Sequence, residues 1–295
     1  MDLDKILRTH NITEEFYNAK KMDKENRIFM SENYVVKLYY PKKYKYYFNE
    51  IQIYKGLLGK DYLPKLYYFG EEKDFKYIVI SKLKGKSLFD SWNTLKQNEK
   101  KSVVLQIANI LKDINGLQTA RINFKDELEQ LFLSIIDNLN YSEKFISAIK
   151  DLYYSKTTSI SNNELSNLIH VDVHFYNFFI NEGKVYAYDF ENTVIAPLDY
   201  QLVRWYKMWK YPHKFKYPKD SMTDAEIRSY DMIMPDLLNE YPEICNSPMF
   251  EDRVKLYTLI YLLQEAKRCD LSEEVTQKYI DENIKIKLME KKHDL

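Results

Sequence analysis

The sequence predicts an α+β fold in two lobes, because its secondary-structure signals change character along the chain. Between residues 26 and 83, short segments rich in β-branched and aromatic residues predict strands around a single helix. From residue 98 onward amphipathic helical patterns dominate, interrupted by one strand-like island at residues 167–195. We therefore predict a small β-rich lobe at residues 1–83, a larger, mainly helical lobe at residues 84–295, and a ligand cleft between them.

In the first lobe, Leu3, Ile6 and Leu7 mark one face of a helix expected in the first ten residues. Two strands are expected at residues 27–30 and 33–40, followed by a helix at 44–59 that ends at a glycine. Two further strands are expected at residues 64–72 and 75–83. The predicted order is therefore strand, strand, helix, strand, strand after the first helix.

In the second lobe, residues 102–117 and 126–139 have the pattern of long amphipathic helices. The strand-like island is predicted to be a hairpin, because Asn181-Glu182-Gly183 has the composition of a hairpin turn. After Asp199 the pattern predicts four or five helices that are interrupted at prolines.

Composition limits the classes of function. Lysine plus arginine equals aspartate plus glutamate at 44 each, and the 27 tyrosines are scattered, so we do not expect a nucleic-acid partner. The two cysteines, Cys245 and Cys269, have no CxxC spacing, which favours free thiols in a reducing cytoplasm. No signal peptide or membrane-spanning apolar run is evident, so a soluble cytoplasmic protein is expected. The oligomeric state is left unknown.

Polar side chains of the island are placed to carry chemistry. Asp172 and Asn177 lie in the segment His170–Asn177, and Asp189 follows the second apolar strand. We expect the three side chains to project from one end of the hairpin. Phosphoryl transfer needs such a set, in which one carboxylate accepts the proton of a hydroxyl while an amide and a second carboxylate hold Mg²⁺.

These residues resemble the motifs of a known family. HVDVHFYN resembles the H-x-D-x-x-x-x-N catalytic loop of aminoglycoside phosphotransferases, which are small-molecule kinases of the protein-kinase-like fold, and YDFE is similar to the metal-binding D-F-G of protein kinases. APLDYQL resembles the family's P-x-D-x-E-L segment, with Gln201 at the position of an acid. The resemblance implies that Asp172 is the catalytic base and that Asn177 and Asp189 bind Mg²⁺.

The N-terminal part fits the same resemblance. Lys37 lies in an apolar strand, as the phosphate-binding lysine of kinases does, and Glu50 on the next helix is placed to pair with it. The stretch YIVISKL resembles the hinge of these kinases. By that resemblance Ile80 flanks the adenine of the nucleotide, and the backbone from Ser81 to Leu83 hydrogen-bonds to it.

The resemblance implies a phosphotransferase that moves the γ-phosphate of ATP or GTP, with Mg²⁺, to a hydroxyl of a small molecule such as an aminoglycoside or choline. One departure concerns the phosphate-covering loop, because the first 55 residues contain no glycine and the turn at Met22–Arg27 takes its place. A catalytically inactive kinase-like scaffold or regulatory protein is therefore kept as an alternative.

Further alternatives use individual residues. His170, Asp172 and His174 alternate along a strand-like stretch and could form the metal site of a hydrolase. A protein acceptor is disfavoured because no A-P-E segment or long activation loop follows the hairpin. Glu265 and Asp270 could bind a cationic acceptor. The tryptophans at 205 and 209, one helical turn apart, could line an acceptor pocket but favour core packing.

Overall fold

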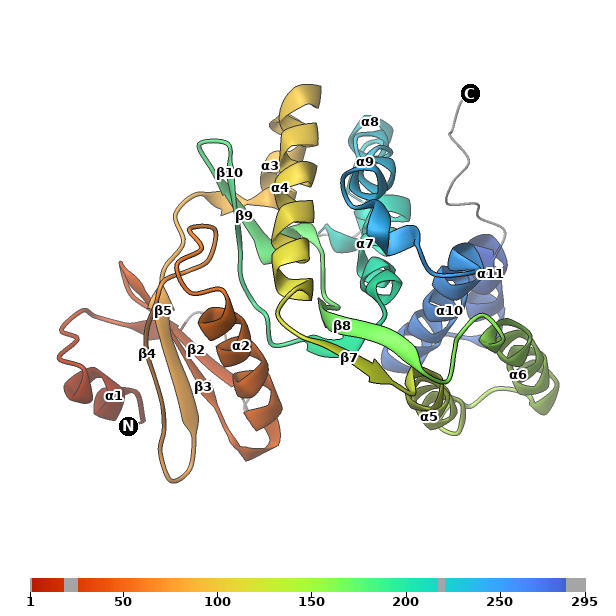
Figure 1. Ribbon diagram of the computed structural model, residues 1–295, viewed down its shortest axis with the longest axis horizontal. Helices are drawn as coiled ribbons and strands as arrows, with labels where there is room; N and C mark the ends of the chain where they lie inside the picture. Colours follow the sequence, from red (N-terminus) through yellow and green to blue (C-terminus); the bar gives the residue numbers. More distant parts are fainter. Residues whose placement is uncertain (1, 19–25, 217–220, 285–295) are drawn as a thin grey trace. The chain divides into compact units, whose positions relative to one another are not determined.

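The computed structural model describes residues 2–18, 26–216 and 221–284, and it confirms the α+β fold (Figure 1). The chain divides into two compact units. The first unit comprises Met1–Leu117 and His174–Val194, and the second comprises Gln118–Val173 and Ile195–Leu295. Because these units are defined by packing alone, the functional lobe boundary after Leu83 stays a prediction.

The first unit contains a five-stranded antiparallel sheet. Its strand order is β1 (Tyr17–Asn18), β2 (Asn26–Met30), β3 (Tyr34–Tyr39), β5 (Lys76–Ser81) and β4 (Leu66–Glu71). The predicted order of strands and helix is confirmed. Strand β1 is an addition, since two residues are too short to produce a recognisable pattern.

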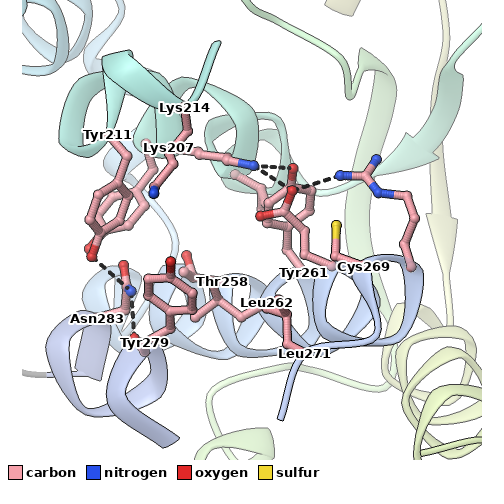
Figure 2. Close-up of a pocket in the computed structure, with 14 residues that line it drawn as sticks. Lys207, Tyr211, Lys214, Thr258, Tyr261, Leu262, Cys269, Leu271, Tyr279 and Asn283 are labelled. Atoms are coloured by element: carbon pink, nitrogen blue, oxygen red, sulfur yellow. Dashed lines mark hydrogen bonds and ion pairs between the residues drawn. The ribbon is translucent and has the colours of Figure 1, made fainter. Parts of the chain in front are cut away.

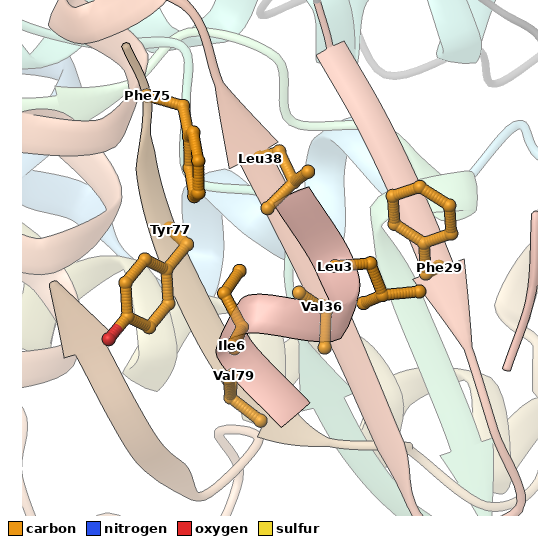
Figure 3. Packing of buried hydrophobic residues seen from close by; sticks show 8 residues of the cluster. All are labelled: Leu3, Ile6, Phe29, Val36, Leu38, Phe75, Tyr77 and Val79. Carbon is orange, nitrogen blue, oxygen red and sulfur yellow. The ribbon is translucent and has the colours of Figure 1, made fainter. Parts of the chain in front are cut away.

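Both faces of this sheet are covered by a helix. On one face, Leu3 and Ile6 of α1 (Asp2–Thr9) pack on Val36 and Leu38 of β3 (Figure 3). Side chains alternate along a strand, so Lys37 points to the opposite face, where α2 (Tyr44–Gly56) lies. The buried cluster under α1 consists of Leu3, Ile6, Phe29, Val36, Leu38, Phe75, Tyr77 and Val79.

The first unit also contains a hairpin, which is shorter than the one predicted for the island at residues 167–195, because β8 (Glu164–His170) pairs with β7 (Thr119–Ile122) and with β11 (Thr193–Ala196) in another sheet. The hairpin is formed by β9 (Phe178–Asn181) and β10 (Lys184–Ala187), and the short β6 (Lys86–Ser87) pairs with β9. Glu182 (φ 49°) and Gly183 (φ 78°) are both left-handed, as a two-residue hairpin turn requires. The remaining helices of this unit are α3 (Leu88–Ser91) and α4 (Gln97–Asn115).

Helix α4 fixes the hairpin through one side chain. The Nε2 group of Gln106 donates to the carbonyl of Gly183 at 2.9 Å, and its Oε1 accepts from the backbone N–H of Val185 at 2.9 Å. Both edges of the turn are therefore held by α4. This arrangement sets the position of the residues that follow β10.

The second unit is mainly helical. Strands β7 (Thr119–Ile122) and β8 (Glu164–His170) pair in antiparallel fashion, and β11 (Thr193–Ala196) adjoins β8. Four or five helices are expected after Asp199, and the described residues contain five α-helices there. The helices of this unit are α5 (Phe124–Ile136), α6 (Glu143–Thr157), α7 (Leu202–Lys210), α8 (Asp224–Arg228), α9 (Ile233–Glu240), α10 (Phe250–Cys269) and α11 (Glu273–Ile284). None of the helices in the described ranges is both long and apolar enough to span a bilayer.

A buried ion pair anchors α10. Arg253 Nε lies 2.5 Å from Asp199 Oδ2, and Arg253 Nη2 lies 3.1 Å from Asp199 Oδ1. Arg253 Nη1 also donates to the carbonyl of Ser159 at 3.1 Å. The aspartate of the APLDYQL segment therefore ties α10 to the turn that precedes α7.

Candidate active site

Three charged side chains singled out in the sequence meet in the first unit. Lys37 Nζ lies 2.5 Å from Glu50 Oε1 and 2.7 Å from Asp189 Oδ1. Lys37 is 6% exposed and Glu50 is fully buried, so both charges have lost nearly all of their water. Removing one partner of such a buried pair costs about 3–5 kcal/mol, whereas an intact pair is tolerated. The predicted pairing of Lys37 with Glu50 is therefore present.

Asp189 owes its position to an uncommon backbone conformation. Its φ of 64° lies in the left-handed region, which aspartate tolerates better than most residues. The residue before it, Tyr188, donates its N–H to the carbonyl of Asn177 at 3.2 Å. Asn177 itself is buried at the end of a 3-10 turn, Phe175–Asn177. A backbone hydrogen bond therefore holds the segment of Asn177 beside that of Asp189, the two residues to which the resemblance assigns Mg²⁺.

Glu191 adds a third carboxylate. Oxygen atoms of Glu50, Asp189 and Glu191 all lie within 4.8 Å of one another, and among the described residues no other group of three acids, histidines or cysteines is so placed. The side chain of Asn49 holds the main chain here, since its Nδ2 donates to the carbonyl of Glu191 at 2.7 Å. Three carboxylates thus lie close together, and two of them contact the ammonium group of Lys37.

The pKa values reflect this excess of negative charge. Burial alone would lower the pKa of Lys37, but attraction to Asp189 and Glu50 holds it well above its usual value. Burial, together with repulsion from Asp189, raises the pKa of Glu191 to about 7. Hard divalent cations prefer such carboxylate and amide oxygens. The residues present therefore fit a Mg²⁺ ion.

Asp172 lies in the second unit, after β8. Its Oδ1 is 3.0 Å from Nε of Arg204 on α7, an ion pair that the sequence does not suggest. Strand β8 ends at His170, so the alternation that would align His170, Asp172 and His174 on one face does not continue. The structure therefore gives no support to a metal site built from these three residues.

Comparison with known proteins identifies the fold. No family model matches the sequence, and no curated protein matches it. Among solved structures, aminoglycoside phosphotransferase APH(2'')-Ib, ADP-bound, is 16% identical with a TM-score of 0.65, and 96% of each chain is covered. This chain has the aminoglycoside phosphotransferase-like fold.

Two further structures show the breadth of that fold. The amicoumacin kinase hAmiN, in complex with AMP-PNP, Ca²⁺ and Ami, is 15% identical with a TM-score of 0.63, and the match covers 98% of this chain and 96% of the other. The choline kinase LicA from Streptococcus pneumoniae is 14% identical with a TM-score of 0.56, covering 96% and 99%. The likeness thus extends over nearly the whole chain, including the C-terminal helices that the motifs do not reach.

In the aminoglycoside phosphotransferase-like fold of this chain, the predicted hinge is the end of β5. Ile80 is buried, and the N–H of Ser81 donates to the carbonyl of Lys65 at 2.9 Å. Within the described chain, the backbone of Leu83 makes no hydrogen bond. The adenine contacts of Ile80, Ser81 and Leu83 stay predictions. The N–H of Ser81 is already used by Lys65, so we expect the backbone of Leu83 to provide the hydrogen bond to adenine.

Other features considered in the sequence have simple outcomes. Trp205 is fully buried and donates its indole N–H to the carbonyl of Ile233 at 3.0 Å, which confirms core packing for this residue. Most of the glycine-free turn at Met22–Arg27 lies outside the described residues.

The sequence alone does not assign a role to Arg204 or Glu191. The only signal for Glu191 is its place in YDFE, and no local pattern points to Arg204.

Proposed function

We propose that this protein is a magnesium- and nucleotide-dependent phosphotransferase acting on a hydroxyl of a small molecule. The observation that carries the proposal is the cluster of Lys37, Glu50 and Asp189, in which Lys37 and Glu50 are buried and which unites residues 152 positions apart in sequence. A buried lysine held between two carboxylates has little value for stability alone. It has a clear use as a fixed positive charge for the phosphates of a nucleotide.

The reaction assigns one role to each residue. The oxygen of the acceptor hydroxyl forms a bond to the γ-phosphorus, the bond from that phosphorus to the β,γ-bridging oxygen breaks, and the nucleoside diphosphate leaves. Asp172 accepts the proton of the hydroxyl, and Lys37 neutralises charge on the α- and β-phosphates. Because there is little covalent chemistry for the protein to perform, positioning and charge neutralisation supply most of the rate.

Asn177 and Asp189 would hold Mg²⁺, and the position of Glu191 makes it a further donor. When bound, the ion neutralises charge that develops on the phosphates. Glu50 keeps its place beside Lys37, because its Oε1 already lies 2.5 Å from the ammonium group. We therefore treat Glu50 as a positioning residue for Lys37.

The acceptor class is supported by the fold neighbours. Their names include streptomycin and gentamicin complexes of one phosphotransferase, an amicoumacin kinase and a choline kinase. All of these are small molecules. This agreement supports a small hydroxylated acceptor.

A thermal-shift titration with ATP and GTP, each with Mg²⁺ and with EDTA, tests the nucleotide site. A ligand that binds only the native state stabilises it by about 2.7 kcal/mol at a hundredfold excess over its Kd. We expect a Mg²⁺-dependent rise in Tm with at least one nucleotide. If neither nucleotide changes Tm, the inactive scaffold becomes the better interpretation.

Two variants separate chemistry from binding. Asp172→Asn should reduce turnover to background while leaving the Mg²⁺–nucleotide shift intact, because its partner Arg204 belongs to the second unit. Asp189→Asn should instead weaken the Mg²⁺-dependent shift itself. Near-normal transfer by Asp172→Asn would rule out its role as the base.

A further inference from the structure

The five-stranded sheet of the first unit has two edges of unequal length. At one edge β1 contains two residues, whereas at the other edge β4 contains six. Strand β4 pairs with β5 on its inner side, and no strand of the described chain pairs with its outer side. An unpaired edge presents backbone N–H and C=O groups that can hydrogen-bond to a further strand.

Three successive aromatic side chains of β4 are exposed. The exposed fraction is 38% for Tyr67, 37% for Tyr68 and 43% for Phe69. Many proteins protect an edge strand with charged residues or proline, but residues 66–70 include neither. The strand has one irregularity, an extra residue at Tyr67, after which Tyr68–Glu71 pair regularly with β5. The edge therefore remains open along most of β4.

The exposed rings are held in place by their neighbours. Tyr68 stacks on His10 at a centroid distance of 3.9 Å, and Tyr67 packs edge-on against Tyr34 at 5.2 Å. The ammonium group of Lys55 lies 4.3 Å from the centroid of the Phe69 ring. Side chains that are already ordered lose less entropy when a partner binds, so this edge is prepared for association.

Opposite charges flank the aromatic residues. Lys65, directly before β4, is exposed, and no carboxylate of the described chain pairs with it. Glu71, at the end of β4, pairs with Lys76, but its side chain is 67% exposed and can accept a second cation. Lys65 and Glu71 are equally far from Tyr68 in sequence. An antiparallel pair of two copies centred on Tyr68 therefore places Lys65 of each copy opposite Glu71 of the other.

We propose that β4 forms a homodimer interface, in which β4 of a second copy of this chain pairs with it antiparallel about Tyr68. The two-fold axis brings two ion pairs together at once and places Tyr67 opposite Phe69. A parallel pair would instead put like charges side by side. A single pair of strands is a small interface, so we expect a Kd on the order of 10–100 µM. The proposal does not depend on the phosphotransferase function.

Sedimentation equilibrium of the full-length protein tests the association. The range should extend from about 5 µM to about 500 µM, so that it brackets the expected Kd. The weight-average mass should rise from that of the 35.6 kDa monomer toward twice this value. A protein that stays monomeric at every concentration overturns the proposal, even if its edge captures an extended peptide.

Lys65→Glu tests the pairing of charges. It places two carboxylates opposite each other at both ends of the interface, which should raise the dimer Kd about tenfold. Lys101→Glu is the matched control, because Lys101 is an exposed lysine of α4 in the same unit, and it should leave the Kd unchanged. Equal Kd values for the two variants, with Tm retained in both, would show that the dimer uses another surface and overturn the proposal.

Hydrogen exchange of the wild-type protein locates the interface without any substitution. Amides that become paired between two copies exchange more slowly, so exchange in β4 should slow as the protein concentration rises through the Kd. Strand β1, at the opposite edge of the same sheet, is the internal control and should exchange at a constant rate. Concentration-dependent protection that appears elsewhere while β4 is unchanged would overturn the proposal.

Discussion

Lys37 keeps its charge in the interior of the first unit because two carboxylates lie against its ammonium group. The same cluster carries one carboxylate more than this pair, that of Glu191. At neutral pH the metal-free protein therefore retains repulsion among Glu50, Asp189 and Glu191. A divalent cation would remove that repulsion, so the excess of acids is what connects this site to metal binding.

Glu191 makes this excess measurable in the metal-free protein. Its folded-state pKa is about 7, against 4.5 for an unperturbed glutamate. Below pH 4.5 both states are protonated. Between pH 4.5 and 7 the folded state binds more protons than the unfolded state, so stability falls as pH rises. We expect a loss on the order of 2 kcal/mol between pH 5 and pH 8.

Glu191→Gln should remove most of this loss, because the amide does not ionise. Urea unfolding in EDTA at pH 5 and pH 8 checks the expectation for both proteins. A wild-type slope that persists unchanged in the variant would show that Glu191 is not the titrating group.

Arg204 acts on the proposed base from a neighbouring helix. Arg204→Met would leave Asp172 without its 3.0 Å partner. We expect kcat to fall about tenfold to a hundredfold, since loss of orientation has effects of that size. The KM for nucleotide should not change, because the Lys37 cluster belongs to the first unit. Steady-state kinetics with Arg204→Lys as the conservative control would detect this split, and an equal change in both constants would indicate a structural role.

At the scale of elements, the long and strongly periodic segments could be predicted from the sequence. Helix α4 (Gln97–Asn115) is an example, since the amphipathic pattern predicted at residues 102–117 covers most of it. The two-residue β1 and the four-residue β7 could not, since pairing with a distant strand rather than a local pattern creates them. Contacts of the candidate active site that connect distant parts of the sequence are likewise not predictable from local patterns.

Lys37 and Glu50 lie on adjacent elements, so their pairing can be predicted from the sequence. The ion pair between Asp172 and Arg204, and the one between Glu265 and Lys207, connect separate elements. Glu265 shows why this matters. From the sequence its carboxylate is a candidate for binding a cationic acceptor, but tertiary packing supplies Lys207 as its partner, and Arg268, three residues further along α10, is a second one (Figure 2).

The anchor of α10 makes an element-scale prediction. Arg253→Met would leave Asp199 buried and charged without its main partner, which should cost about 3–5 kcal/mol of folding free energy. The double variant Asp199→Leu/Arg253→Met should recover a large part of that loss, since no unpaired charge remains at position 199. Urea unfolding compares the three proteins. A double variant no more stable than Arg253→Met would show that the pair contributes through geometry that apolar side chains cannot replace.

The whole molecule is built from two units whose segments alternate along the chain. The first unit recruits residues 174–194 across a long sequence separation, so its charged cluster forms only after distant segments have met. The entropy of closing the intervening chain must be lost before such contacts form, which slows the folding of the regions that depend on them. The cluster around Asp189 should accordingly be among the later parts of the first unit to fold.

Binding of Mg²⁺–ATP at the Lys37 cluster predicts a local pattern of hydrogen-exchange protection. Exchange reports local opening, and a ligand suppresses those openings that destroy its site. Mg²⁺–ATP should slow exchange in α2 and around Tyr188, whose N–H is bonded to Asn177. Helix α10 belongs to the second unit and should exchange at an unchanged rate. Protection by Mg²⁺–ATP confined to α10, with α2 unaffected, would mean that the nucleotide does not occupy the Lys37 cluster. Protection of α2 together with the Tyr188 region would place the nucleotide at the Lys37 cluster. Within the described chain this is the one location that buries a lysine between two carboxylates, one of them 152 residues away in sequence.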